Sequence, residues 1–131
     1  MFLDTSGLLC YLDHTEPGHV EACRLMIAAP RRLTHSYVLA ELVALAQARG
    51  LPRRPVLEFL EGVMDGLFVD VVYVDEELHR EAVDLLSRRL DKTYSLCDAV
   101  SFLVMEARGM IEALTTDHHF EQAGFVRLIH P

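Results

Sequence analysis

The chain has 131 residues, of which 51% are hydrophobic, and its 20 acidic and 12 basic residues give a formal net charge of −8. This length corresponds to one domain with enough apolar material for a core. The acidic balance argues against broad electrostatic binding to nucleic acid. No apolar stretch reaches the roughly 18 residues that span a bilayer, so we expect no membrane segment.

The N-terminal sequence and the cysteines indicate a cytoplasmic protein. The opening MFLDTSGLL lacks the basic region of a secretory signal. Its three cysteines are an odd number without CxxC spacing, which is typical of free thiols in a reducing compartment.

Strand and helix patterns alternate along the chain. In order, they predict a strand at 1–4, a helix at 6–12, a helix that follows the turn at 16–20 and ends near 29, a strand at 32–34 and helices at 37–49 and 55–66. They continue with a strand at 68–74, a helix capped by Asp75, a helix at 95–108, a strand at 110–115, a helical turn at 120–123 and a strand at 126–129. Strands separated by helices predict an α/β domain with a mainly parallel sheet and helices on both faces.

Two of these helices carry recognisable apolar faces. Val20, Cys23 and Ile27 recur at helical spacing in the second helix. In the helix after Asp75, the residues on one face are Leu78, Ala82, Leu85, Leu86 and Leu90. We expect both faces to pack against the core.

Four acidic residues differ from the others, which lie beside arginines on amphipathic helices. Asp4 ends the first strand and Asp117 follows ALTT, and ligands of open α/β sheets bind at the carboxyl ends of strands. Glu41 is the only charge in YVLAELVALAQA, a helix so apolar that we expect it to be largely buried. Asp98 opens the apolar run SLCDAVSFLVM.

Each acid also has a purely structural explanation. Asp4 and Asp117 could cap the helices that follow them, and Ser95 with Asp98 matches a capping box. A buried Glu41 would need a compensating cation, which its own helix turn does not supply, although a basic side chain from elsewhere would serve.

Taken together, the four carboxylates indicate a metal site. A cluster of acids without lysine or arginine repels itself unless divalent cations neutralise it. Oxygen ligands suit Mg²⁺ or Mn²⁺, and such ions promote the attack of water on a phosphate. The residues therefore favour metal-assisted phosphodiester hydrolysis.

The sequence TTDHHF at 115–120 raises the alternative of a zinc site. His118 and His119 are adjacent, so they lack the i, i+4 spacing of an HExxH site, and no cysteine lies nearby. This favours Asp117 as the functional group, with one histidine of the pair as a possible RNA contact.

The chain resembles the PIN-domain ribonucleases, in particular the VapC-type toxins of bacterial toxin–antitoxin pairs. The resemblance covers nearly the whole chain and rests on FLDTSGLL, Glu41 in YVLAELVAL, Asp98 in SLCDAVSFLVM and Asp117 in ALTTDHHFEQAGF. It implies a single domain over 1–131 with an α/β/α sandwich, RNA cleavage with Mg²⁺ or Mn²⁺, a homodimer and a small antitoxin partner.

The resemblance also implies roles for individual residues. The metal site and catalytic centre would be Asp4, Glu41, Asp98 and Asp117, and the hydroxyl neighbours that position water or phosphate would be Thr5, Ser6 and Thr116. Independently, Arg88, Arg89 and Lys92 lie just ahead of Asp98 and could contact RNA phosphates. Their alternative role is that of an exposed helix end, where basic side chains favour the helix dipole.

Two other functions remain open. FLDTSG also resembles the start of an aspartyl-nucleophile phosphatase of the haloacid-dehalogenase type, but that pattern needs a second aspartate where this chain has Ser6. It also needs a downstream lysine, and Lys92 is the only lysine present. The other alternative is a PIN-like module that binds a partner without catalysis.

Overall fold

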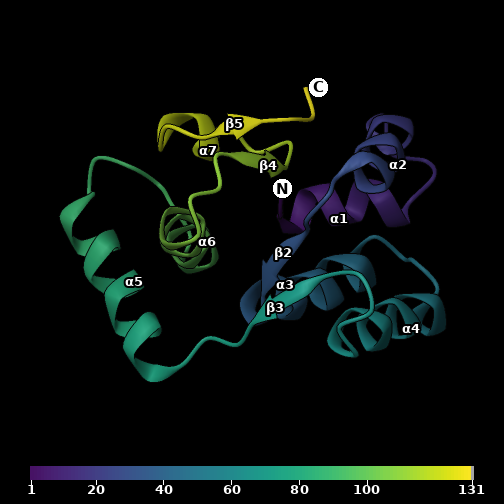
Figure 1. Cartoon of the computed structure of the whole chain (residues 1–131), viewed down its shortest axis with the longest axis horizontal. Helices are drawn as coiled ribbons and strands as arrows, with labels where there is room; N and C mark the ends of the chain where they lie inside the picture. Colours follow the sequence, from purple (N-terminus) through teal and green to yellow (C-terminus); the bar gives the residue numbers. More distant parts are fainter. Residues whose placement is uncertain (131) are drawn as a thin grey trace.

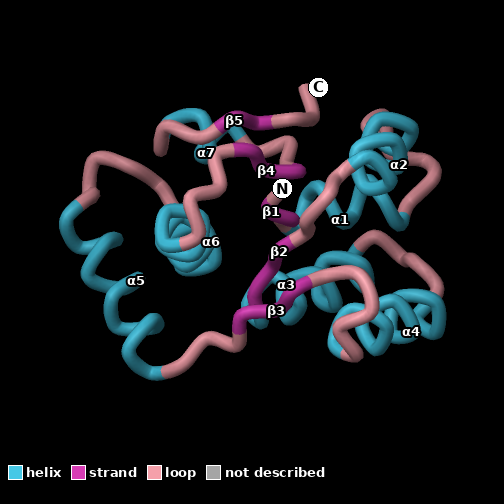
Figure 2. Tube along the Cα trace, viewed as in Figure 1, coloured by secondary structure: helices cyan, strands magenta, loops and turns pink. Residues whose placement is uncertain are grey.

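A computed structural model describes residues 1–130, which form an α/β domain around a five-stranded parallel sheet (Figures 1 and 2). The strands are β1 (Phe2–Leu3), β2 (Leu33–His35), β3 (Asp70–Val72), β4 (Glu112–Leu114) and β5 (Val126–Arg127), in the sheet order β3-β2-β1-β4-β5. The helices are α1 (Thr5–Leu12), α2 (His19–Ala28), α3 (Ser36–Ala48), α4 (Arg53–Met64), α5 (Glu76–Arg88), α6 (Leu96–Ala107) and α7 (His118–Gln122). The predicted parallel α/β class is confirmed.

The helices cover both faces of the sheet. Figure 1 shows α5 and α6 on one side of the strands and α1, α2 and α4 on the other. Helix α3 contacts α1, α4 and α6. The arrangement is the three-layer α/β/α sandwich expected from the family resemblance.

Strand β1 is the centre of the sheet and of the core. Phe2 and Leu3 are fully buried, as expected for a parallel strand that is covered on both faces. Leu3 lies opposite Leu114 in the register of β1 and β4, and the Asp4 amide donates to the Leu114 carbonyl at 3.2 Å. The register therefore places Asp4 beside Thr115, at the carboxyl edge of the sheet.

This edge is also the point where the chain changes direction across the sheet. From β1 the chain passes to β2 and β3 on one side, and β4 and β5 are added on the other side. Open α/β sheets bind ligands at such a switch point. The topology therefore places the end of β1 where a ligand site is expected.

A buried histidine, His35, caps helix α3. Its Nδ1 accepts hydrogen bonds from the amides of Tyr37 and Val38, so Nε2 carries the proton and donates to Ser101 Oγ at 2.8 Å. The Ser101 hydroxyl in turn donates to the Cys97 carbonyl. Burial lowers the pKa of His35 to about 4, which keeps the imidazole neutral. The network ties the start of α3 to α6.

The prediction that the face of α2 with Val20 and Ile27 packs against the core is wrong. Val20 and Ile27 are 79% and 81% exposed, whereas Ala22 and Met26 are buried. Helix α2 packs on α1 through this i, i+4 pair, which lies on the opposite side from Val20 and Ile27. Leu90 is also exposed, because α5 ends before it.

The prediction that the three cysteines are free thiols is confirmed. Cys10, Cys23 and Cys97 are free, and two of them are buried. Within residues 1–130, no helix combines the length and the apolar character needed to span a bilayer.

Gly7 allows the close approach of α1 to β4. A Cβ at this position would lie 1.9 Å from the Leu114 carbonyl oxygen, a backbone atom that cannot move without disturbing the sheet. We expect Gly7→Ala to lower the free energy of unfolding by at least about 3 kcal/mol, measured by urea titration.

Gly62 provides the matched control. It lies inside α4, and a Cβ there would meet its nearest neighbour, Phe68 Cε1, at 3.7 Å. Because alanine favours a helix interior over glycine, Gly62→Ala should raise stability by up to about 1 kcal/mol. Equal effects of the two substitutions would contradict the packing of α1 on β4.

Candidate active site

Four acids from four elements gather at the carboxyl edge of the sheet. Asp4 follows β1, Asp117 follows β4, Glu41 lies in α3 and Asp98 in the first turn of α6. Burial is the main cause that raises the pKa of Asp4 and of Asp98, and the charges of Asp98 and Glu41 add to the shift of Asp4 as the charge of Asp117 adds to that of Asp98. Asp4 is therefore within electrostatic range of Asp98 and Glu41, and Asp98 is within range of Asp117.

Asp4 is the most deeply buried carboxylate of the group. Burial raises its pKa to about 7, and a hydrogen bond from the Thr115 hydroxyl opposes this shift. Oδ2 accepts that bond at 2.7 Å and a longer one from Ser6 Oγ at 3.3 Å. Asp4 occupies the N-cap position of α1, yet its side chain makes no capping hydrogen bond. Helix capping therefore does not explain Asp4.

Two hydroxyls join the loop after β1 to the loop after β4. Thr115 Oγ1, bonded to Asp4, also accepts from the Asp117 amide at 3.0 Å. Ser6 Oγ lies 3.0 Å from Thr115 Oγ1 and accepts from the Thr116 amide at 3.0 Å. These bonds fix the separation between the first and the last acid of the site.

Sequence reasoning missed Thr115 and chose its neighbour Thr116. Thr116 joins the network through its backbone, since its amide donates to Ser6 Oγ, and its carbonyl accepts from Arg127 Nη1. A signal for Thr115 was present, because side chains two residues apart in an extended chain lie on the same side. Thr115 and Asp117 form such a pair.

Thr5 carries a buried polar atom beside Asp4. Its Oγ1 has no oxygen or nitrogen hydrogen-bond partner among residues 1–130, and its polar neighbour is the Cys97 thiol. A buried hydroxyl without a partner costs about 1–3 kcal/mol, so this oxygen marks a place where a ligand or a water would be stabilising.

Asp98 combines a structural role with a place in the cluster. Its Oδ2 accepts from the Ser95 amide, and Ser95 Oγ accepts from the Asp98 amide, both at 3.0 Å. The predicted capping box is thus confirmed. Burial is the main cause that raises the pKa of Asp98, and the bonds from Ser95 and His119 oppose it. The box aims the carboxylate at the sheet edge.

The expectation that Glu41 is buried is wrong, because its side chain is exposed. Helix α3 buries a narrow stripe that contains Val38, Leu39, Leu42 and Ala46. Its other face carries alanines that tolerate solvent, including Ala40 and Ala44, so an apolar composition did not mean burial on all sides. Glu41 therefore joins the cluster from the solvent side.

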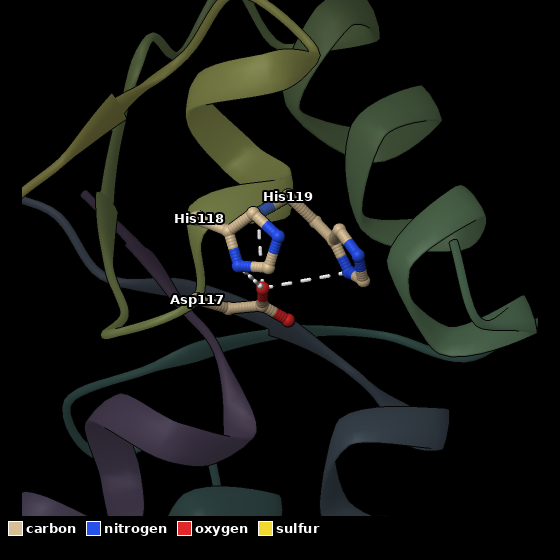
Figure 3. Close-up of side chains that lie close together, drawn as sticks. All are labelled: Asp117, His118 and His119. Carbon is tan, nitrogen blue, oxygen red and sulfur yellow. Dashed lines mark hydrogen bonds and ion pairs between the residues drawn. The ribbon is translucent and has the colours of Figure 1, made fainter. Parts of the chain in front are cut away.

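Asp117 caps α7 and contacts both histidines. Its Oδ1 accepts from the His119 amide at 2.9 Å, so the capping alternative holds for this residue. The His119 ring lies between two acids, with Nδ1 3.1 Å from Asp98 Oδ2 and 3.4 Å from Asp117 Oδ1. Figure 3 shows both imidazoles turned toward the Asp117 carboxylate. His119 is a bridge that the sequence did not reveal.

The basic residues ahead of Asp98 lie at the end of α5 and in the segment that joins it to α6. Arg88 ends α5, and the Arg89 guanidinium is paired with Asp91 at 3.0 Å. Lys92 follows, and next to it Thr93 Oγ1 lies 3.1 Å from His119 Nε2. The segment therefore runs up to the acidic cluster.

The donor set fits a divalent cation. No lysine or arginine within residues 1–130 forms an ion pair with Asp4 or Asp98, although both carboxylates are buried. Carboxylate and hydroxyl oxygens are the ligands that hard cations prefer. A positive ion is the component that would make this burial favourable.

Comparison with known proteins identifies the family. A model described as "PIN domain" matches residues 1–126. The chain belongs to the PIN domain family. The resemblance inferred from the acidic motifs is thus confirmed. The family match favours the PIN domain over the phosphatase alternative.

Relatives of this PIN domain include VapC proteins. The chain is 31% identical over 129 residues to the "23S rRNA-specific endonuclease VapC20" of two strains of Mycobacterium tuberculosis, covering 98% of this chain and 97% of the relative. A "VapC ribonuclease" of Archaeoglobus fulgidus is 24% identical over 110 residues, which cover 79% of this chain and 69% of the relative. The crystal structure of M. tuberculosis VapC20, described as a sarcin–ricin loop cleaving toxin, superposes with a TM-score of 0.88 at 30% identity, covering 99% and 98% of the two chains.

The raised pKa of Asp4 makes the stability of the metal-free protein depend on pH. The folded state holds the Asp4 proton up to about pH 7, whereas an unfolded aspartate loses it near pH 4. The stabilisation from this proton is complete below about pH 4 and is lost as the pH rises through about 7.

Asp4→Asn should therefore be more stable than the wild type in EDTA at pH 8, by about 2–4 kcal/mol. The difference should shrink toward pH 5, in urea titrations of both proteins at each pH. Because both proteins contain His35, comparing them at equal pH removes the contribution of its titration from the difference in stability. A variant less stable than the wild type at pH 8 would mean that Asp4 is a structural residue.

Proposed function

We propose that this protein is a metal-dependent endoribonuclease and the toxin of a type II toxin–antitoxin pair. The observation that supports this best is the buried carboxylate of Asp4, held without a cationic partner beside Asp98 on a PIN domain. The cation proposed is Mg²⁺ or Mn²⁺, because the donors are oxygens. The whole chain, 1–131, would act as a single domain.

The roles follow from burial and contacts. Asp4 and Asp98 are buried and would hold the cation, and Glu41 and Asp117, which are more exposed, would complete the negative site and orient water. A bound divalent cation supplies charge that stabilises the attacked phosphate and makes water a better nucleophile. Ser6 and Thr115 keep the Asp4 carboxylate in place, and the unpaired hydroxyl of Thr5 is available to a water or a phosphate oxygen.

A structured RNA is the substrate we propose. The VapC20 relative is described as specific for 23S rRNA and as cleaving the sarcin–ricin loop. At 31% identity over nearly the whole chain, a 23S rRNA stem-loop is the first RNA to test. Arg88, Arg89 and Lys92 would contact phosphates, because their segment reaches the acidic cluster at Thr93. Catalysis distinguishes this proposal from a PIN-like module that only binds.

Asp98→Asn tests the catalytic role. Asparagine keeps the shape of the side chain and an oxygen for the Ser95 amide but removes the charge. We expect a loss of about 10²–10³ or more in the rate of RNA cleavage with Mn²⁺, comparable to the removal of one electrostatic stabiliser in other enzymes. The assay uses purified 23S rRNA and a mixed structured RNA, with EDTA as the blank.

Asp84→Asn is the matched control, since Asp84 is an exposed acid on α5, outside the cluster. It should retain the wild-type rate. Circular dichroism and melting show whether Asp98→Asn is folded. Cleavage by folded Asp98→Asn at the wild-type rate would remove Asp98 from the site, and cleavage that persists in EDTA would remove the metal.

We propose further that the protein is a cytoplasmic homodimer that binds a small antitoxin. Several large apolar side chains are exposed, and the most exposed of them are Val20, Ile27, Leu67 and Leu90. Val20 and Ile27 lie on one exposed face of α2, whereas Leu67 and Leu90 lie after α4 and α5, so the proposal rests mainly on the family resemblance.

Light scattering tests the dimer directly. We expect a mass of twice the 14.8 kDa chain at high micromolar concentration. A mass of one chain at that concentration would contradict the homodimer, and it would leave the nuclease proposal unaffected.

A further inference from the structure

Three consecutive side chains at the start of α7 point their ligand atoms at one place. His118 Nδ1 lies 3.6 Å from Asp117 Oδ1, and His119 Nδ1 lies 3.4 Å from the same oxygen. All three atoms lie within 4.8 Å of one another. Figure 3 shows the carboxylate below the two rings, with both Nδ1 atoms directed at it.

The spacing suits a tetrahedral transition-metal ion. Zinc binds imidazole nitrogen and carboxylate oxygen at about 2.0–2.1 Å, so the edges of its coordination tetrahedron measure about 3.3 Å. The two nitrogen–oxygen distances, 3.4 and 3.6 Å, are close to this edge. Small side-chain rotations would therefore bring all three atoms onto one ion.

Sequence spacing failed to predict this convergence because the three residues do not share one regular helix. Asp117 is extended, with φ −83° and ψ 122°, and the helix begins only at His118. The change of direction turns the Asp117 side chain back under the two rings. An i, i+4 rule applies within a helix and does not cover this corner.

We propose that Asp117, His118 and His119 form a second metal site, selective for Zn²⁺ and similar transition-metal ions, that inhibits RNA cleavage when it is filled. The donors are two nitrogens and one oxygen, which favour zinc over magnesium. Three protein ligands leave a fourth position open to water, unlike structural zinc sites, which have four protein ligands.

Inhibition follows from shared residues, and this part of the inference rests on the proposed nuclease function. Asp117 belongs to both sites, so zinc bound there withdraws one carboxylate from the acidic cluster. His119 Nδ1 faces Asp98 at 3.1 Å, and a nitrogen bound to zinc no longer donates to that carboxylate. Zinc at one site thereby alters two acids of the other.

His118 gives the cleanest test of the site. Its side chain is 65% exposed and its only polar contact among the described residues is with Asp117, whereas His119 is 16% exposed and also contacts Asp98 and Thr93. Replacement of His118 by alanine thus removes a zinc ligand and leaves the rest of the acidic edge in place.

Co²⁺ is the probe for binding, because tetrahedral Co²⁺ with nitrogen ligands absorbs strongly in the visible range and octahedral Co²⁺ in oxygen ligands absorbs weakly. The titration is made in excess Mg²⁺, which occupies the oxygen site. We expect tetrahedral bands with one equivalent of Co²⁺, displaced by Zn²⁺. His118→Ala should weaken binding at least about tenfold, since even residues behind a metal ligand contribute that much.

Two control variants fix the assignment. His14→Ala removes an exposed histidine far from Asp117 in the sequence, and Cys23→Ser removes a thiol that lies 3.6 Å from the His19 ring, a sulfur–nitrogen pair away from the proposed site. Both should keep the tetrahedral bands. Bands that survive in His118→Ala, or that disappear in Cys23→Ser, would overturn the site.

The inhibition is measured as the ratio of cleavage rates with and without micromolar Zn²⁺, in the presence of Mn²⁺. For the wild type, the rate with Zn²⁺ should be at most about one tenth of the rate without it. For His118→Ala, the two rates should differ much less. Equal ratios for both proteins would overturn the inhibitory role. Tetrahedral bands in a protein that cleaves no RNA would instead leave the zinc site standing and reject the nuclease proposal.

Discussion

The burial of the Asp4 carboxylate without a basic partner is the constraint on which the rest of the site depends. Phe2 and Leu3 fix β1 in the centre of the sheet, and the next residue is an acid at the carboxyl edge. The hydroxyls of Thr115 and Ser6 hold one oxygen of this acid, but they bring no positive charge. The fold thus buries a carboxylate that is stable when it is protonated, as burial favours below about pH 7, or when a cation lies beside it.

The N-termini of three helices lie at the rest of this edge, and each is capped by a different type of residue. His35 caps α3, Ser95 caps α6 and Asp117 caps α7, and each of these helices contributes an acid to the cluster or is capped by one. Capping bonds fix the first turn of a helix, so they also fix the direction of Asp98 and Asp117. The positive ends of the helix dipoles point toward the same edge and offset part of the repulsion among the acids.

The sequence was sufficient for the order of strands and helices, and it singled out four acids as candidates for the site. Asp4, Asp98 and Asp117 stand out because each follows an apolar strand or opens an apolar helix, which fixes their position whatever the details of packing. The alanine-rich face of α3 could not be separated from a buried face, so the prediction that Glu41 is buried was wrong. The prediction that Val20 and Ile27 face the core was wrong for a related reason, since a short helix with scattered apolar residues has more than one possible buried side.

Contacts between distant segments were beyond reach of the sequence. The bond between Thr115 and Asp4 joins residues 111 positions apart, and it depends on the register of β1 and β4. The bridge from His119 to Asp98 depends on how α7 sits against α6. Periodicity and capping patterns describe neighbours along the chain, so they indicate which acids matter and leave open which groups hold them.

Anomalous diffraction from crystals soaked in Mn²⁺ measures the position of the proposed cation directly. We expect an anomalous peak bounded by the carboxylates of Asp4 and Asp98, at a Mn²⁺ concentration that supports RNA cleavage. Crystals of Asp4→Asn soaked in the same solution should show that peak weakened or absent. Density for Mn²⁺ elsewhere in the wild-type protein, with none between Asp4 and Asp98, would show that these two acids do not hold the cation.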